Sequence, residues 1–238
     1  MGAERDKCRS GFDRARRSHK ERTTAEMPAT SPFDDLARAA LAVPVTLSNA
    51  ALDQCQRYVE TLLLWRQRLS LTSAKTAPSI ALDHILDSLY VLPLLKPGWR
   101  VADIGSGAGF PGVPLAIACP EARFVLLEPR RKRANFLREV ARQAQLLNVE
   151  VSEVRVEDLA NTDSPSSFDV VVSRAFGPVQ DLLTLSVDLL MPGGLVIAMK
   201  GPKGRQELGL HPGFAQPEIV EYSLPSGAQH LLLVHRRR

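Results

Sequence analysis

Apolar residues in the first third of the chain follow a helical period. Between residues 32 and 95 they recur at intervals of three and four positions, a spacing typical of helices that bury one face. Phe33 and Leu36 begin one such face, a second covers residues 52–69, and a heavily apolar third covers residues 80–95. The pattern therefore predicts two or three helices ahead of the first strand.

Beyond residue 99, short runs rich in Val and Leu alternate with helical segments. The predicted strands cover residues 100–104, 123–128, 149–154, 168–173, 195–199, 219–223 and 230–234. The predicted helices among the first five strands cover residues 111–118, 130–147 and 179–190. This alternation indicates an α/β fold whose parallel sheet carries helices on both faces. The short connection between the last two strands favours an antiparallel hairpin at the sheet edge.

The composition supports one principal domain with extensions. The chain has 238 residues, of which 45% are hydrophobic and 24% charged, so it is long enough to bury a full core. Residues 1–31 differ, because they contain eight Lys or Arg and few large apolar residues, which predicts a disordered basic tail. We expect a helical extension over residues 32–96 and a Rossmann-like domain over residues 97–238.

Charge and cysteine content indicate which partners and which cellular compartment to expect. A net charge of +4 and a pI near 9.1 are weak indications of a polyanionic partner. Cys8, Cys55 and Cys119 are too widely spaced for a disulfide framework or a metal site, which fits a reducing compartment. No apolar run approaches the roughly 18 residues that span a bilayer. We therefore expect a cytoplasmic monomer with no membrane segment and no metal.

The segment VADIGSGAGFPG at residues 101–112 occupies the first strand-to-helix turn. It contains G-x-G-x-G at Gly105, Gly107 and Gly109, and a shifted G-x-G-x-x-G that ends at Gly112. The first spacing is typical of a methyl-donor nucleoside site and the second of a dinucleotide site. Glycines permit positive φ and close approach of the backbone to a ligand, at a turn where open parallel sheets bind ligands.

Neighbouring residues distinguish the two ligands. Pro111 and Pro114 lack N–H donors that a pyrophosphate would use at a helix N-terminus. Asp103 would repel a pyrophosphate but attract the sulfonium and ammonium of S-adenosylmethionine. Pro111 also keeps Phe110 out of the helix, so we expect the phenyl ring to lie against a bound adenosine. Glu128 ends the second strand, where a carboxylate accepts hydrogen bonds from ribose hydroxyls with either cofactor. Gly112 is then interpreted as a packing residue.

With these features in place, a family resemblance becomes visible. Residues 101–140, together with WRQRLSLTS and HILDSL upstream and SRAFGP and AMKGP downstream, resemble the glucose-inhibited division protein B family. The likeness covers roughly residues 50–205. It implies a class I S-adenosylmethionine-dependent methyltransferase with a seven-stranded sheet and an N-terminal helical extension. It also implies methylation of guanine N7 in 16S ribosomal RNA, presented as RNA or as the 30S subunit.

The resemblance also assigns site residues. It places Gly105 and Phe110 on the cofactor, joined by Val156 and Glu157 after the third strand and Arg174 after the fourth. Together with Asp103, Gly107 and Glu128, which the loop and the strand ends indicate, the expected cofactor-binding residues are Asp103, Gly105, Gly107, Phe110, Glu128, Val156, Glu157 and Arg174. Glu157 could accept a hydrogen bond from the adenine amino group. Arg174 could orient the cofactor carboxylate or bind an RNA phosphate, since a guanidinium suits both.

The remaining residues fit methylation of an atom that already carries a lone pair. The fourth strand is followed by SRAF rather than by the Asn or Asp and two prolines of amine methyltransferases. No cysteine lies where it could attack a pyrimidine. Guanine N7 has an in-plane lone pair and no proton, so the protein mainly needs to position it. We expect Arg174 and Lys200 to position substrate or stabilise phosphate charge, although Lys200 could be a solvated strand end.

Basic residues predict where RNA binds. The expected phosphate contacts are Arg130, Arg131, Lys132, Arg133, Arg138, Arg142, Lys200, Lys203, Arg205 and residues 236–238. Several of the helical ones could equally solvate an outer face. His84 and Asp87 could border the substrate opening or form a buried structural contact. Two other functions stay open, a small-molecule methyltransferase with a helical lid and a non-catalytic RNA-binding module.

Overall fold

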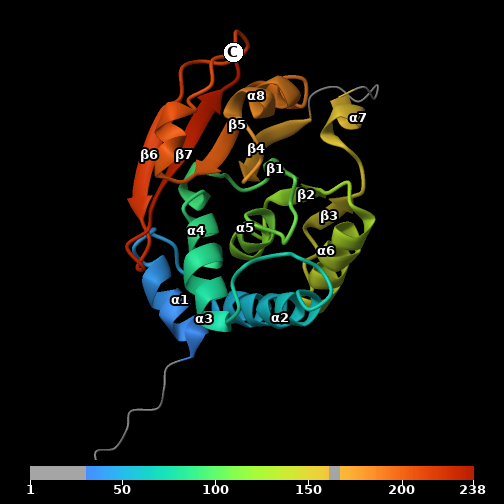
Figure 1. The fold of residues 1–238 in the computed structure, drawn as a ribbon, viewed down its shortest axis with the longest axis vertical. Coiled ribbons are helices and arrows are strands. Elements are labelled where there is room, and N and C mark those ends of the chain that lie inside the picture. The colour runs from blue at the N-terminus through green and yellow to red at the C-terminus, as the bar shows by residue number, and fades with distance from the viewer. Residues whose placement is uncertain (1–30, 161–166) are drawn as a thin grey trace, which may run out of the picture. The chain divides into compact units, whose positions relative to one another are not determined.

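The computed structural model describes residues 31–160 and 167–238 (Figure 1). Ser31–Arg238 form one compact unit. The expected basic tail lies outside the described residues except for Ser31, whose side chain accepts a hydrogen bond from the Phe33 N–H and caps helix α1 (Pro32–Ala40). Ser31 therefore belongs to the first helix rather than to the tail, because its hydroxyl satisfies a backbone donor of the first turn.

The predicted N-terminal helices are present, with one difference. Helix α2 (Asn49–Trp65) is capped by Ser48, and the short α3 (Ala77–Ser79) follows. The predicted helix at 80–95 is instead a π-helical turn, η1 (Ile80–Ile85), then α4 (Leu86–Leu89) and a 3-10 turn, η2 (Leu92–Leu94). Pro93 cannot donate to the residue four positions earlier, so a regular helix cannot continue through it.

The predicted seven-stranded sheet is confirmed. Its strands are β1 (Arg100–Ile104), β2 (Arg123–Leu127), β3 (Val149–Ser152), β4 (Phe168–Arg174), β5 (Leu190–Lys200), β6 (Glu218–Ser223) and β7 (Gln229–Arg236). The order is β3-β2-β1-β4-β5-β7-β6. Strands β1 to β5 pair in parallel, whereas β7 is antiparallel to both β5 and β6. The expected edge hairpin is therefore β6–β7.

Helices cover both faces of this sheet. They are α5 (Gly112–Ala118), α6 (Arg131–Gln143), α7 (Val156–Ala160) and α8 (Val179–Ser186), with a 3-10 turn, η3 (Pro202–Gln206), after β5. Helix α7 was not predicted, because five residues are too few to reveal a period. The predicted helix at 179–190 ends earlier, since Leu190 already pairs with Phe168 in the sheet.

The core has two apolar clusters. Alternation along β1 assigns Val101 to one and Ala102 to the other. The first cluster contains side chains of α1, α2, α4, α5 and α6, and the second contains those of α7 and α8. The N-terminal helices therefore share a core with α5 and α6, as Figure 1 shows for α2 and α4 beside α5. The division at residue 96 stays a prediction.

Candidate active site

A cavity of about 250 Å³ opens at the carboxyl ends of the first four strands. The chain winds from β1 through β2 to β3 on one side and then crosses to β4 on the other, so the cavity adjoins the switch point of the sheet. Its walls are formed by Ile104, Gly105, Leu127, Glu128, Pro129, Arg130, Arg133, Val154, Arg155, Val156, Glu157, Ala175 and Phe176. The walls combine apolar side chains with five charged ones, a mixture that suits the base and the hydroxyls of a nucleoside.

The glycine loop next to the cavity has the backbone shape expected of it. Gly105, Gly107 and Gly109 have φ of 72°, 54° and 98°, a region that L side chains rarely adopt. The Tyr58 hydroxyl, on α2, donates a 2.7 Å hydrogen bond to the Ala108 carbonyl. The loop is therefore held from the N-terminal helices as well as by its own sequence.

Glu128 lies at the cavity with its carboxylate fixed. The residue is 3% exposed. One carboxylate oxygen, Oε2, accepts from the Gly107 N–H at 3.1 Å, and Oε1 accepts from the Arg130 N–H at 2.9 Å. Each oxygen has a second lone-pair site, so these bonds orient the group and leave it able to accept from a ligand hydroxyl.

Asp103 is buried beneath the first turn of α5. Its Oδ2 accepts from the Gly112 N–H at 3.1 Å, whereas Oδ1 has no hydrogen-bond partner among residues 31–160 and 167–238. Burial raises the pKa of this carboxyl from 3.8 to about 7. An added Cβ at Gly112 would come within 2.6 Å of Oδ2 and 2.4 Å of Leu126 Cδ2, so the predicted packing role of Gly112 is confirmed. Asp103 does not line the cavity, and its contact with the cofactor stays a prediction.

Residues at the ends of β2, β3 and β4 complete the cavity. Val156 and Glu157, assigned by the resemblance, line it from the start of α7. Pro129, Val154 and Phe176 line it as well and were not predicted. Their signal was available, because each follows a strand whose carboxyl end faces the site, and residues at that position meet ligands in parallel sheets.

Phe110 packs outside the cavity, against the N-terminal helices. Its ring is 4% exposed and does not line the cavity. It packs instead against Tyr58 and His84, with ring centroids 5.5 and 5.0 Å away. The Arg174 guanidinium carbon lies 4.6 Å from the centroid of the phenyl ring, a cation–π contact. The loop directs this ring towards α2 and η1, where it supports Arg174, and its expected contact with the cofactor stays a prediction.

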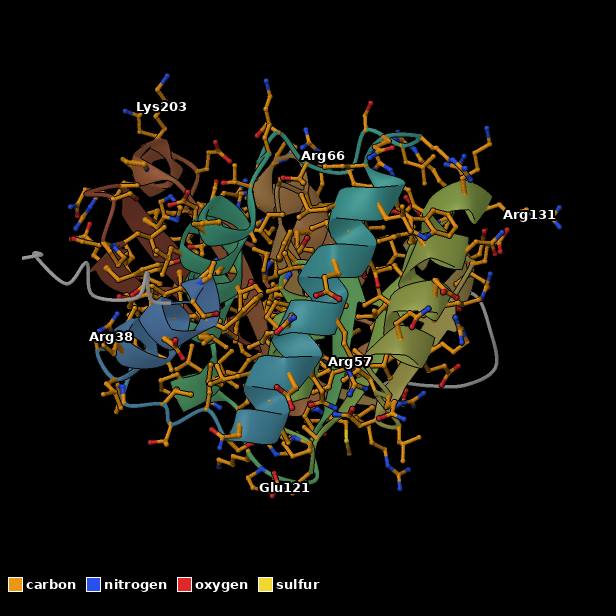
Figure 2. All side chains as sticks on the ribbon, turned by 90° about the horizontal axis from the view of Figure 1, so that it is seen from below. Arg38, Arg57, Arg66, Glu121, Arg131 and Lys203 are labelled. Carbon is orange, nitrogen blue, oxygen red and sulfur yellow. The ribbon has the colours of Figure 1, made fainter. Side chains whose placement is uncertain are left out.

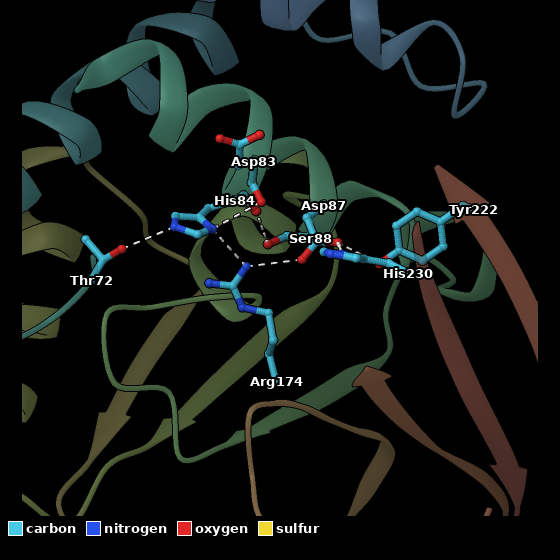
Figure 3. Close-up of polar contacts among 8 residues, drawn as sticks. All are labelled: Thr72, Asp83, His84, Asp87, Ser88, Arg174, Tyr222 and His230. Carbon is cyan, nitrogen blue, oxygen red and sulfur yellow. Dashed lines mark hydrogen bonds and ion pairs between the residues drawn. The ribbon is translucent and has the colours of Figure 1, made fainter. Parts of the chain in front are cut away.

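Arg174 lies at the centre of a polar network (Figure 3). Its Nη1 donates to Asp87 Oδ2 at 3.1 Å and lies 3.3 Å from His84 Nδ1. The other oxygen of Asp87 accepts from the Tyr222 hydroxyl at 2.7 Å and lies 2.6 Å from His230 Nδ1. The buried histidine contact of Asp87 is thus with His230, while Arg174 links Asp87 to His84.

His84 completes the network on the side of the α2–α3 loop. Its Nε2 lies 3.2 Å from the Thr72 hydroxyl. Burial lowers the pKa of His84, and the charge of Arg174 lowers it further. The imidazole is therefore neutral at physiological pH, and its Nδ1 lies 3.1 Å from the Asp83 carbonyl as well as 3.3 Å from Arg174 Nη1.

Lys200 has intramolecular partners. Its Nζ donates to the Gly177 carbonyl at 2.7 Å and pairs with Glu207 at 2.8 Å. The side chain is 15% exposed, so the alternative of a solvated strand end is wrong. These bonds fix the segment after β4, and the expected role of Lys200 towards substrate stays a prediction.

Basic residues divide into two groups by position. In Figure 2, Arg66, Arg131 and Lys203 lie along one edge, whereas Arg38 and Arg57 lie away from it. Arg131 belongs to the first turn of α6, directly after the cavity residue Arg130. We call Arg66, Arg131, Lys132, Arg133 and Lys203 the basic rim.

Other predicted phosphate contacts differ. Arg138 pairs with Glu153 at 3.1 Å and Arg142 with Glu139 at 2.7 Å, further along α6. Residues 236–238 lie away from the active face, because β7 runs antiparallel to β5: Leu231 pairs with Lys200 at the carboxyl end of β5, and the Arg237 N–H donates to the Gly194 carbonyl further back along that strand. Their expected place in a rim around the active face is therefore wrong.

The described residues offer neither a membrane-spanning helix nor a metal-binding cluster. None of the helices in the described part of the chain is long and apolar enough to cross a membrane. Within residues 31–160 and 167–238, no group of three or more His, Cys, Asp or Glu side chains could hold a metal ion.

Comparison with known proteins identifies the family. The family described as rRNA small subunit methyltransferase G matches residues 51–231. A relative named ribosomal RNA small subunit methyltransferase G from Syntrophotalea carbinolica is 36% identical over 203 residues, which cover 82% of this chain and 94% of the relative. One of the same name from Yersinia enterocolitica is 39% identical over 197 residues, which cover 81% and 94%.

Solved structures confirm the fold. The cofactor-bound structure of Rv0187 from MTB matches with a TM-score of 0.56 at 20% identity, over 86% of this chain and 97% of that one. A SAM-dependent methyltransferase from Aquifex aeolicus matches with a TM-score of 0.52 at 17% identity, over 68% and 94%. The predicted class I methyltransferase fold is therefore confirmed, and the chain belongs to the rRNA small subunit methyltransferase G family of S-adenosylmethionine-dependent enzymes.

Proposed function

We propose that this chain transfers the methyl group of S-adenosylmethionine to N7 of a guanine in the 16S ribosomal RNA of the small ribosomal subunit. The observation that carries the proposal is the extent of the family match. Residues 51–231 include Tyr58, the glycine loop, Glu128, Arg174 and His230, and so every part of the described site. We further propose that the protein acts as a cytoplasmic monomer.

The cavity fits the nucleoside part of this cofactor. Its volume, about 250 Å³, lies just below the roughly 300–1,000 Å³ of clefts for drug-sized ligands, so it suits an adenosine better than a dinucleotide. Leu127, Val154 and Val156 would flank the adenine, and Glu128 would accept hydrogen bonds from ribose hydroxyls. Glu157 would accept from the adenine amino group. Bound S-adenosylmethionine supplies an electrophilic methyl group on a positively charged sulfur.

The residues of the site then need only to position the guanine. Because N7 has a free lone pair and carries no proton, no general base is required, and holding the reactants in line supplies much of the rate. Arg174 is suited to this task. Its side chain is 22% exposed, and its hydrogen bonds within residues 31–160 and 167–238 use only Nη1. Its Nη2 and Nε would face a phosphate or a carboxylate.

The basic rim is suited to RNA. Arg131, Lys132 and Lys203 are exposed, and Arg133 reaches the Ser70 carbonyl at 3.2 Å in the loop between α2 and α3. Positive side chains around the active face favour binding of a polyanion by neutralising phosphates and releasing counterions. We propose that these residues hold the RNA while the target guanine enters beside Arg174.

The proposal is tested with purified protein and a labelled methyl donor. The substrates are 30S particles from a strain that lacks this enzyme, and the free 16S RNA extracted from them. Digestion and chromatography identify the modified nucleoside. We expect labelled N7-methylguanine, and the comparison of particle with free RNA identifies the form that is recognised.

Other outcomes would favour other functions. Turnover of a small metabolite with no response to RNA would indicate a small-molecule methyltransferase. RNA binding without measurable cofactor binding by calorimetry would indicate a non-catalytic module. Label in any base atom other than guanine N7 would refute the proposed specificity while leaving the family assignment intact.

A further inference from the structure

A buried carboxylate outside the cavity connects the edge hairpin to the active face. The Asp87 side chain is 2% exposed and lies on α4, whereas its partners lie on β4, β6 and β7. It accepts from Arg174 through Oδ2, from the Tyr222 hydroxyl through Oδ1, and lies 2.6 Å from His230 Nδ1 (Figure 3). A buried carboxylate with three such partners has a fixed position.

This arrangement determines how Arg174 is presented. Its guanidinium is held on one face by the Phe110 ring and at Nη1 by Asp87 and His84. A guanidinium is planar, so fixing one nitrogen and one face also fixes the direction of the remaining donors. The partly exposed donors of the Arg174 guanidinium are then already oriented before the substrate binds, which lowers the entropy lost on binding.

We propose that Asp87 is a positioning residue for the methyl transfer, and that Tyr222 and His230 make the β6–β7 hairpin a working part of the active site. Asp87 acts through Arg174, while Tyr222 and His230 act through Asp87 by fixing its second oxygen. The inference rests on the proposed function, because it concerns the same site and the same RNA substrate.

A nearby tyrosine offers a matched control. The Tyr90 hydroxyl donates to the Ser223 carbonyl at 3.1 Å, and the ring stacks on Tyr222 with centroids 3.9 Å apart. Tyr90→Phe therefore removes a hydroxyl that also contacts β6 but does not reach Asp87. Any general effect of loosening the hairpin appears in Tyr90→Phe, whereas the proposed effect appears only in Tyr222→Phe.

The experiment measures cofactor affinity by calorimetry, and kcat and KM on 30S particles, for Arg174→Ala, Asp87→Asn, Tyr222→Phe and Tyr90→Phe. Whichever parameter Arg174→Ala changes most, we expect the same parameter to worsen about 100-fold in Asp87→Asn and about 10-fold in Tyr222→Phe, since hydrogen bonds to a charged group are lost. Tyr90→Phe is expected to change it less than about 2-fold. Thermal unfolding is measured on every variant, and Tyr222→Phe provides the result if Asp87→Asn does not fold.

A double mutant separates positioning from a structural role. If Asp87 acts through Arg174, then Asp87→Asn added to Arg174→Ala produces little further loss. Additive losses, or equal effects of Tyr222→Phe and Tyr90→Phe, would overturn the inference. An inactive wild type would instead contradict the proposed function, so the two failures are distinguishable.

Discussion

Asp103 makes the free energy of unfolding depend on pH. Burial raises the pKa of its carboxyl to about 7, from 3.8 in an exposed chain. The folded protein therefore keeps the proton up to about pH 7, whereas the unfolded chain releases it near pH 4. The contribution of this group to stability is complete below pH 4 and is lost progressively as the pH rises towards 7.

The size of the effect follows from the two pKa values. They differ by about 3 units, and each unit corresponds to about 1.4 kcal/mol, so the total is about 4 kcal/mol. About 3 kcal/mol of this falls between pH 5 and pH 8, where most domains can be studied reversibly. Asp103→Asn removes the titration, and its amide oxygen can still accept from the Gly112 N–H.

Urea denaturation of wild type and Asp103→Asn at pH 5 and pH 8 measures this difference. We expect the variant to gain about 3 kcal/mol relative to wild type between the two pH values. Other titrating groups, including the half-buried His84 and the buried His235, are common to both proteins and cancel. A difference between the two proteins that is the same at pH 5 and pH 8 would refute the reasoning.

Three further predictions concern packing, cofactor and RNA. Gly112→Ala should cost about 1–3 kcal/mol of stability in urea, because the added methyl group would come within 2.4 Å of Leu126; wild-type stability would show that the turn adapts. Glu128→Gln should weaken cofactor binding about tenfold in calorimetry, because a hydroxyl binds a carboxylate more strongly than an amide; unchanged affinity would place the ribose elsewhere. Arg131→Ala should reduce the slope of log affinity for RNA against log salt concentration by about 1, whereas Arg38→Ala, away from the basic rim, should not. Equal slopes for the two variants would show that RNA does not bind at Arg131.

The local pattern of apolar residues was sufficient to predict most of the fold. The five inner strands each bury a short apolar run, and the edge strands β3 and β6 were found from their Val and Ile content although they bury little. The edge hairpin followed from a connection too short for a crossover. The helix predicted over residues 80–95 is helical without a break only to Leu89, because the apolar spacing continues through Pro93 although the backbone hydrogen bonds cannot. Helix α7 was not predicted, because its one and a half turns are too short to show a helical period.

Site residues could be predicted from the sequence where they directly follow a parallel strand. Gly105 and Glu128 directly follow β1 and β2, and the topology alone brings them to one cavity, whereas Glu157, at the start of α7, was assigned by the family resemblance. The direction of the Phe110 ring could not be predicted, because it depends on packing against helices far along the chain. The partners of Asp87 could not be predicted from the sequence either, since Tyr222 is 135 positions away along the chain.

The position of β6 at the sheet edge has a consequence for motion. Within the sheet it bonds only to β7, whereas β7 bonds on both sides. If the hairpin detaches from β5 as a unit, the β7 amides that bond to β5 become free to exchange with solvent, whereas the hydrogen bonds between β6 and β7 can persist. Each such opening also withdraws Tyr222 and His230 from the buried carboxylate that they hold. The free energy of detaching the hairpin thus limits the fraction of time for which this carboxylate keeps all its partners.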